Sequence, residues 1–249
     1  SEIHNKVRYL QSHNIAAVKE GLTQPDEYIL FMAHWDHLGF MNGAQLGEDK
    51  IANGAVDNAT GVAAVLELAK RFSEIETKRS IMFLAVTLEE SGLLGSEYFA
   101  KYPPIDLSNI VAGFNYDAIL PTGLTNDMVV VGYGASELED LLEEELSKSG
   151  RYINPDPNPD KGYFYRSDHI SFAKRGVPVL YADGGFDLVE GGKEAGFIIE
   201  EQYRLDAYHG VGDEYDESWN LDGLNQSIDV IFNISNELAN SSQWPNWYD

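Results

Sequence analysis

Two adjacent acidic residues, Glu89 and Glu90, directly follow an apolar run over residues 81–88 and lead into a glycine-containing turn. A continuous apolar run of this length is typical of a strand buried on both faces. Ligands of α/β proteins usually bind outside the carboxyl ends of the sheet strands. The position of the two carboxylates therefore predicts an active site, and a pair of solvated acids in a turn is the less favoured interpretation.

Other side chains with suitable chemistry occupy comparable positions. His34 and Asp117 each end an apolar run, and Asp57 immediately precedes a predicted helix. His209 lies in a glycine-containing segment nearer the C-terminus. Because the chain contains no cysteine, these nitrogen and oxygen donors predict zinc or a similar divalent cation. Taken singly, each residue is more simply explained as a core histidine, a helix cap or a solvated acid.

The charge balance excludes one class of partner. Lys and Arg number 17 and Asp and Glu number 41, which gives a formal net charge of −24 at pH 7. Such a charge repels phosphate backbones and anionic membrane surfaces, so we expect no nucleic-acid partner. The absence of cysteine also excludes disulfides, thiolate metal ligands and a cysteine nucleophile.

The chain has the size of one large α/β domain. No apolar stretch approaches the roughly 20 residues that a membrane-spanning helix needs. Residues 1–6 contain neither an initiator methionine nor the pattern of a signal peptide. We therefore expect residues 1–249 to form a single catalytic domain without a transmembrane segment, either processed or excised from a longer precursor.

Hydrophobic periodicity predicts alternating strands and helices. Short apolar runs predict strands at residues 15–19, 28–33, 80–88, 110–116, 128–132 and 177–182. Apolar side chains at helical spacing predict helices at residues 60–72, 136–149 (capped by Ser136) and 222–240. Three prolines predict a surface loop over residues 154–160, and paired glycines predict a long loop over residues 183–201 that contributes to a binding site.

Several short segments, taken in order, match a family pattern. They are His34-Trp35-Asp36, Val56-Asp57-Asn58, the Glu89-Glu90 pair with its following turn, Asn115-Tyr116-Asp117, Ser167-Asp168-His169 and Tyr208-His209. Together they resemble the co-catalytic zinc aminopeptidases related to aminopeptidase Y and bacterial leucyl aminopeptidase. The resemblance runs from about residue 28 to the C-terminal helix. It implies an α/β three-layer sandwich, in which a mostly parallel twisted sheet has helices on both faces.

The resemblance also implies the metal ligands. Two Zn²⁺ ions per chain would share the carboxylate of Asp57 as a bridge. His34 and Asp117 would complete one site, and Glu90 and His209 the other. Two close cations of this kind can acidify a shared water and polarise a carbonyl group.

The family pattern assigns Glu89 as the general base. A carboxylate that does not bind metal must remain near the attacking water to take its proton and pass it to the leaving amine. In relatives, a non-proline cis peptide bond follows the bridging residue. We therefore predict a cis peptide between Asp57 and Asn58.

Two aspartates are predicted to support the ligating histidines. By the family pattern, Asp36 accepts a hydrogen bond from the second ring nitrogen of His34, which fixes the tautomer of the ring. Asp213 is expected to support His209 in the same way, with helix capping or solvent exposure as an equal alternative. His37 is expected to be structural rather than ligating.

The substrate pocket is less well defined by sequence. Segments near residues 119–124, 163–169 and 186–202 are expected to form it. Tyr163 and Tyr165 are candidates for stabilising the oxyanion, with simple aromatic packing as the alternative. Asp168 and His169 match a family motif near the pocket, where His169 could contact substrate or organise the loop.

The sequence thus predicts a zinc aminopeptidase that hydrolyses the N-terminal bond of peptides with a free N-terminus. By resemblance it would be secreted, periplasmic or in the cell envelope. Three alternatives remain: a carboxypeptidase of the same family, a single-zinc glutaminyl cyclase-like aminoacyltransferase, and a receptor ectodomain that has lost metal ligands. The cyclases typically place Trp before the last zinc histidine, where this chain has Tyr208. All five expected ligands are present, which disfavours the non-catalytic alternative.

Overall fold

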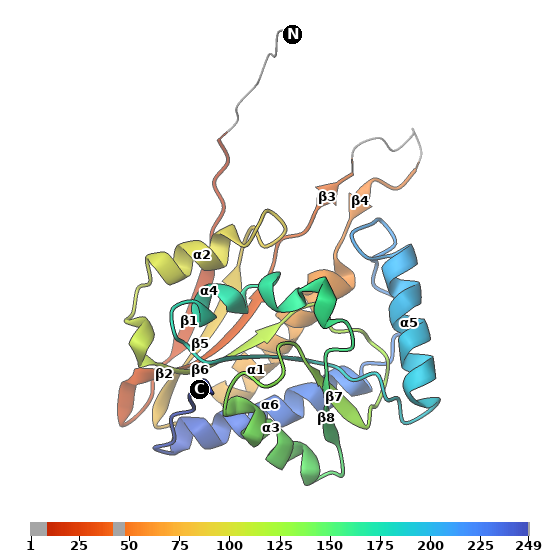
Figure 1. The fold of residues 1–249 in the computed structure, drawn as a ribbon. Coiled ribbons are helices and arrows are strands. Elements are labelled where there is room, and N and C mark those ends of the chain that lie inside the picture. Colours follow the sequence, from red (N-terminus) through yellow and green to blue (C-terminus); the bar gives the residue numbers. More distant parts are fainter. Residues whose placement is uncertain (1–8, 42–47, 249) are drawn as a thin grey trace.

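The computed structural model describes residues 9–41 and 48–248. Within these residues, the centre of the molecule is a seven-stranded sheet in the order β1-β5-β2-β6-β9-β7-β8 (Figure 1). Its strands are β1 (Ile15–Lys19), β2 (Gln24–His34), β5 (Arg79–Val86), β6 (Ile110–Tyr116), β7 (Asp127–Val130), β8 (Tyr152–Pro155) and β9 (Val179–Asp183). The central strands β5, β2, β6 and β9 are parallel, whereas β1 is antiparallel to β5 and β7 is antiparallel to β9. A separate antiparallel pair, β3 (Gly39–Phe40) and β4 (Ile51–Ala52), projects from the body of the molecule (Figure 1).

Helices cover both faces of the sheet (Figure 1). The longer helices on one face are α1 (Gly61–Ser73), α3 (Leu138–Ser147) and α6 (Asp222–Asn240). The opposite face is covered by α2 (Leu94–Lys101) and α4 (His169–Ala173), and α5 (Gly192–Asp206) lies at one side of the molecule (Figure 1). Within the described residues, no helix is long and apolar enough to cross a membrane.

The buried side chains of β2 alternate between two hydrophobic cores. Ile29 and Phe31 belong to the core under α1, α3 and α6, and Leu30 and Met32 belong to the core under α2 and α4. Because successive side chains of a strand point to opposite faces, a continuous apolar run satisfies both cores at once. This explains why the buried part of β2 is an unbroken apolar segment in the sequence.

The order of the strands creates a switch point at β2. The chain leaves β2, crosses through α1 to β5 on one side, and returns through α2 to β6 on the other side. Ligand sites of open α/β sheets form where neighbouring crossovers diverge in this way, at the carboxyl ends of the strands. The predicted fold class, a mostly parallel sheet between layers of helices, is confirmed.

The strongest periodic segments form the predicted elements. The strands predicted at residues 15–19 and 110–116 and the helix predicted at residues 222–240 have the observed bounds. Helix α1 agrees to within a residue at each end. The very short β3 and β4 and the helices α2 and α4 were not predicted, because one or two turns carry too little periodicity to stand out.

Two local predictions were wrong, and a third holds for only part of its segment. The long loop expected at residues 183–201 contains most of α5: Gly191 and Gly192 stand at the start of this helix, and Gly196 lies within it, where a Cβ would lie 2.0 Å from the carbonyl oxygen of Phe186. The loop expected at residues 154–160 begins with the end of β8, an edge strand where Pro155 needs no amide partner. Ser136 does not cap α3; the carboxylate of Glu139 accepts hydrogen bonds from three backbone amides, those of residues 134–136.

Candidate active site

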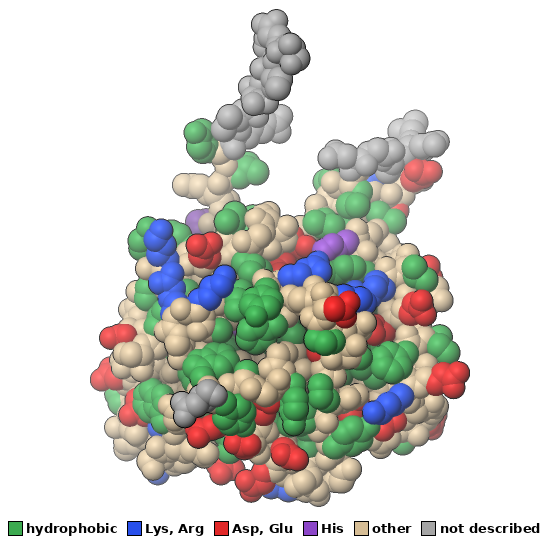
Figure 2. All heavy atoms as spheres, viewed as in Figure 1, with side chains coloured by type: hydrophobic (Ala, Val, Ile, Leu, Met, Phe, Trp, Pro, Cys, Tyr) green, Lys and Arg blue, Asp and Glu red, His purple; other side chains and the backbone are tan. Residues whose placement is uncertain are grey.

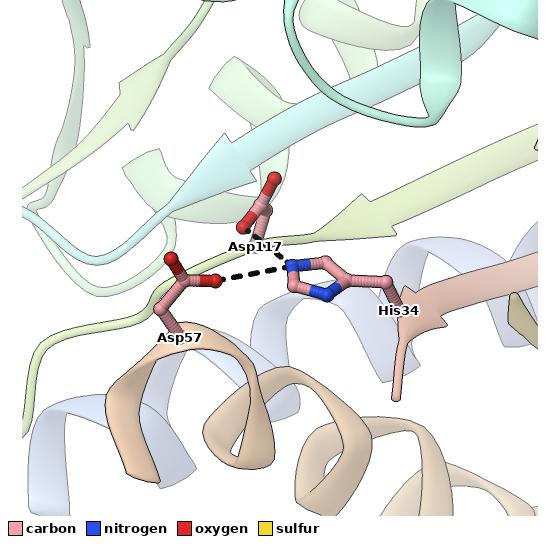
Figure 3. A group of neighbouring side chains, drawn as sticks. All are labelled: His34, Asp57 and Asp117. Carbon is pink, nitrogen blue, oxygen red and sulfur yellow. Dashed lines mark hydrogen bonds and ion pairs between the residues drawn. The ribbon is translucent and has the colours of Figure 1, made fainter. Parts of the chain in front are cut away.

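The carboxyl ends of β2, β5 and β6 bring the predicted ligands together. His34 is the last residue of β2, Asp117 follows β6, and Asp57 lies in the irregular turn that leads into α1. In Figure 3 these three side chains point toward one another from different elements. Glu89 and Glu90 follow β5 and line a pocket that Asp57 and Asp117 also line.

A first cluster is built around His34. Its Nε2 atom lies 3.1 Å from Asp57 Oδ1 and 3.3 Å from Asp117 Oδ1 (Figure 3). The His34 side chain is 1% exposed, so these carboxylates lie next to a desolvated imidazole. Burial alone would lower the pKa of His34, but hydrogen bonds with Asp117 and Asp57 raise it to about 12. The cluster therefore strongly favours positive charge between its carboxylates, either as a proton or as a cation.

A second cluster lies on the other side of Asp57. His209 Nε2 is 3.2 Å from Asp57 Oδ2 and 3.3 Å from Glu90 Oε2. His37 Nδ1 is 2.7 Å from the other oxygen of Glu90. Burial opposes ionisation of Asp57, yet hydrogen bonds with His209 and His34 hold its pKa well below the usual range. Asp57 thus directs one oxygen to each cluster.

The spacing of these atoms fits divalent metal ions. Two ligand atoms that share a tetrahedral zinc ion, with bonds of about 2.0–2.1 Å, lie about 3.3 Å apart. The four contacts of His34 and His209 with carboxylate oxygens measure 3.1–3.3 Å. Ligand atoms of His34, Asp57 and Asp117 also lie within 4.8 Å of one another. The donor set and its spacing therefore fit zinc at both clusters.

The backbone around Asp57 is held from two sides. Asp213, which is 1% exposed, accepts hydrogen bonds from the Val56 amide (2.8 Å), the Asp57 amide (3.0 Å) and the Tyr203 hydroxyl (3.1 Å). Support of His209 was one of the two equal expectations for Asp213; in the structure its carboxylate instead fixes the turn that presents Asp57. The Asp57-Asn58 peptide bond is cis, as predicted.

Asn58 ties this turn to β6. Its side-chain amide donates to the carbonyl oxygen of Tyr116 (2.9 Å), and its Oδ1 accepts from the amides of Gly61 and Ala118 (both 3.1 Å). One buried side chain therefore connects the start of α1 with the backbone on both sides of Asp117. This role of Asn58 was not predicted from the sequence, although Asn58 directly follows the expected bridging residue.

Asp36 supports the site in a way that differs in detail from the prediction. His34 Nδ1 contacts the backbone carbonyl oxygen of Asp36 at 3.0 Å, whereas the Asp36 carboxylate is 3.8 Å away. That carboxylate accepts a hydrogen bond from the Glu89 amide at 3.1 Å. The carbonyl group can fix the tautomer of His34, and the carboxylate positions the start of the Glu89-Glu90 turn.

A pocket of about 570 Å³ opens beside the two clusters. Each of the three segments expected to form it contributes: Leu120 and Thr122 from the first, residues 163 and 165–167 from the second, and Phe186 and Glu200 from the third. Tyr163 and Tyr165 both line it, as the proposed oxyanion role requires. Glu89 also lines it, and burial followed by the charge of Asp117 raises the pKa of Glu89 to about 9.

One wall of the pocket includes Tyr203, Arg204 and Tyr208, which lie outside the three segments expected to form it. Arg204 lies 5.5 Å from the ring centre of Tyr163 and 5.8 Å from that of Tyr208, and Arg166 lies 5.8 Å from the ring centre of Tyr163. The ring of Tyr208 also stacks on His209, with ring centres 3.9 Å apart. In the sequence Arg166 directly follows Tyr165 and Arg204 directly follows Tyr203, and this neighbourhood of Tyr and Arg is the signal that could have identified the wall.

Asp168 and His169 lie behind the pocket wall. The His169 ring packs between Phe164 and Tyr181, with ring centres 4.8 and 5.0 Å apart, and burial lowers its pKa to about 3. Burial likewise raises the pKa of Asp168 to about 7. Both side chains are at most 1% exposed and neither lines the pocket, so His169 is placed to organise the loop rather than to contact substrate.

Comparison with known proteins supports the predicted resemblance. Residues 14–235 match the model of the family described as Peptidase family M28. Leucine aminopeptidase 2 of Trichophyton equinum is 26% identical over 190 residues, which cover 70% of this chain and 36% of that protein. A probable zinc metalloprotease of Pyrenophora tritici-repentis is 37% identical over 105 residues, which cover 42% of this chain and 24% of that protein.

The fold is also found among solved structures. The aminopeptidase from Aneurinibacillus sp. strain AM-1 superposes with a TM-score of 0.68 at 22% identity, covering 94% of this chain and 49% of that chain. At this identity the likeness shows the fold alone. The chain spans less than two fifths of the length of the two curated relatives named above.

Proposed function

This chain belongs to peptidase family M28, and from that membership we propose that it is a di-zinc aminopeptidase acting on peptides with a free N-terminus. The observation that carries the proposal is the orientation of Asp57. Its two oxygens lie 3.1 Å from His34 Nε2 and 3.2 Å from His209 Nε2, so a single carboxylate serves two histidine clusters. This is the arrangement expected of a ligand that bridges two cations.

In the proposed site, His34, Asp57 and Asp117 would hold one ion, and Asp57, Glu90 and His209 the other. Bound zinc would polarise the substrate carbonyl, acidify the attacking water and bring the pKa of Glu89 down toward neutral pH. The curated relatives bear the names leucine aminopeptidase and probable zinc metalloprotease, which supports zinc as the metal.

Glu89 is the general base of the proposed reaction. Its side chain lines the pocket, and its amide is held by the Asp36 carboxylate. The Glu89 carboxylate would take a proton from the attacking water and deliver it to the nitrogen of the leaving amine. Tyr163 and Tyr165 are the proposed donors to the oxygen that becomes negatively charged, because both line the pocket. Action outside the cytoplasm is a further proposal, which rests on the family resemblance alone.

The proposal is tested by measuring zinc per chain and the release of amino acids from a matched set of peptides. We expect two zinc ions per chain and release of the N-terminal residue, which acetylation of the N-terminus should abolish. Release from the C-terminus would instead identify a carboxypeptidase. One zinc per chain together with cyclisation of N-terminal glutaminyl peptides would identify a glutaminyl cyclase-like enzyme.

A further inference from the structure

His37 occupies an unexplained position in the second cluster. Its side chain is 7% exposed, and its ring lies 5.9 Å from that of His209, measured between ring centres. The backbone of Gly54 packs directly against it, because a Cβ on Gly54 would lie 2.6 Å from His37 Cγ. The ring is therefore held in place at the edge of the site rather than projecting into solvent.

The contact between His37 and Glu90 is short but is not a hydrogen bond. His37 Nδ1 and Glu90 Oε1 lie 2.7 Å apart. These two atoms and the other ring nitrogen of His37 are buried. None of the three has a hydrogen-bond partner among the described residues. Buried polar atoms that make no hydrogen bond cost free energy unless another group satisfies them. A cation that both atoms bind would do so.

The position of the side chains agrees with such a cation, although His37 Nδ1 and Glu90 Oε1, 2.7 Å apart, would have to separate to the about 3.3 Å expected of two ligands of one zinc ion. Ligand atoms of His37, Asp57 and Glu90 all lie within 4.8 Å of one another. The two oxygens of Glu90 face different imidazoles, His37 at 2.7 Å and His209 at 3.3 Å. Both histidines therefore approach the same carboxylate, that of Glu90.

We infer that His37 is a sixth protein ligand of the proposed di-zinc centre and binds the ion held by Glu90 and His209. This inference rests on the proposed function, because it concerns the same site. One ion would then have two imidazole and two carboxylate ligands from the protein, whereas the other would have one imidazole and two carboxylates. Four protein ligands are typical of closed zinc sites, and three leave a position open. The two sites should consequently differ in their affinity for zinc and in the rate at which bound zinc exchanges with zinc in solution.

Zinc titration of the metal-free protein, in competition with a chromophoric chelator, tests the inference without an activity measurement. The variants are His37→Ala, His37→Gln, the benchmark His209→Ala and the control His13→Ala, whose side chain is exposed outside the site. We expect His37→Ala and His37→Gln to weaken one of the two dissociation constants by about 10-fold or more, as loss of metal-site groups does. His13→Ala should leave both constants unchanged.

A purely structural role for His37 gives a different result. Both zinc dissociation constants would then stay within about twofold of wild type, while the melting temperature of the metal-free His37→Ala protein would fall; that result overturns the inference. Cobalt(II) provides a second readout, because loss of a nitrogen ligand should change the visible spectrum of one cobalt equivalent only. If the wild-type protein binds two zinc ions but cleaves no peptide, the proposed function fails and the titration still decides the role of His37.

Discussion

Glu89 and Glu90 are neighbours in sequence but have different surroundings. The two oxygens of Glu90 lie 2.7 Å from His37 and 3.3 Å from His209, so both face nitrogen atoms that can share a cation. Glu89 has its amide fixed by Asp36 and its side chain on the pocket wall. Glu90, which lies beside other candidate ligands, can therefore bind metal, and Glu89, which lines the pocket, can transfer the proton.

Glu89→Gln should separate these roles. The amide keeps the size of the side chain but cannot take a proton from water, so kcat should fall by about 10²–10⁴-fold, the usual contribution of a positioned base. Zinc content, measured by elemental analysis, should remain at the wild-type level. Glu90→Gln is the matched control: it should lose affinity for one zinc ion and regain part of its activity when zinc is added.

The opposite pattern would exchange the two assignments. Loss of zinc from Glu89→Gln, combined with an inactive Glu90→Gln protein that keeps both ions, would make Glu90 the base. Full peptidase activity in both variants would reduce the pair to a charged turn.

Asp57→Ala should weaken both metal sites together. Its oxygens lie 3.1 Å from His34 Nε2 and 3.2 Å from His209 Nε2, so its removal takes a ligand from each cluster and leaves two cations without shielding. His34→Ala should mainly deplete one site. Zinc analysis after dialysis distinguishes the two variants, and two tightly bound ions in Asp57→Ala would contradict the bridging role.

At the scale of elements, the site exists because three parallel strands end at one edge. Their apolar runs carry a strong signal, so β2, β5 and β6 and the polar residues that follow them could be predicted from the sequence. Because parallel strands end at one edge of the sheet, the predicted strand ends were enough to predict that His34, Glu89, Glu90 and Asp117 lie close together. The roles of those residues came from the family resemblance, because spacing alone does not distinguish a ligand from a base.

The supporting contacts could not be predicted, because they depend on where backbone groups lie in space. Asp213 was expected either to support His209 or to serve as a cap or a solvated acid, and its carboxylate binds amides in the turn at residues 56–57. Residues 183–201 were expected to form a loop because of paired glycines at 184–185 and 191–192, yet the second pair stands at the start of α5. His37 was expected to be structural, and its contact with Glu90 appears only in three dimensions.

Gly61→Ala tests how α1 is joined to β6. Intrinsic helix propensity favours Ala over Gly by about 1 kcal/mol, which by itself would stabilise the protein. A Cβ on Gly61, however, would lie 2.2 Å from Asn58 Oδ1, so Asn58 must move and release the backbone near Asp57 and Asp117. Small misplacements of catalytic groups cost about 10²-fold in rate, and we expect a loss of that order in kcat/KM together with weaker zinc binding.

The control for this variant is Leu66→Ala, because Leu66 is 64% exposed on the same helix. Its activity and zinc affinity should match those of the wild-type protein. A Gly61→Ala protein with a raised melting temperature and unchanged kcat/KM would show that Asn58 does not position the two aspartates.

At the scale of the whole molecule, acidic charge is the dominant feature. The net charge is −24, and Figure 2 shows acidic side chains spread over much of one face. The site concentrates the same charge, because Asp57, Glu89, Glu90 and Asp117 converge on one pocket. Like charges at short range oppose the folded state unless protons or cations compensate them. Zinc should therefore contribute to stability as well as to catalysis.

Removal of zinc should lower the melting temperature of the wild-type protein. A ligand that binds only the folded state at about 1,000 times its dissociation constant stabilises that state by about 4 kcal/mol. For a domain of about 150–250 residues, each kcal/mol shifts the melting temperature by about 2–4 °C, which gives a decrease of about 8–16 °C on chelation. Thermal unfolding with and without a chelator, and after zinc is restored, measures this shift. Asp57→Ala is the control, since a protein that has lost its shared ligand should respond little to chelator; equal melting of wild-type protein in both conditions would mean that the converging carboxylates hold no zinc.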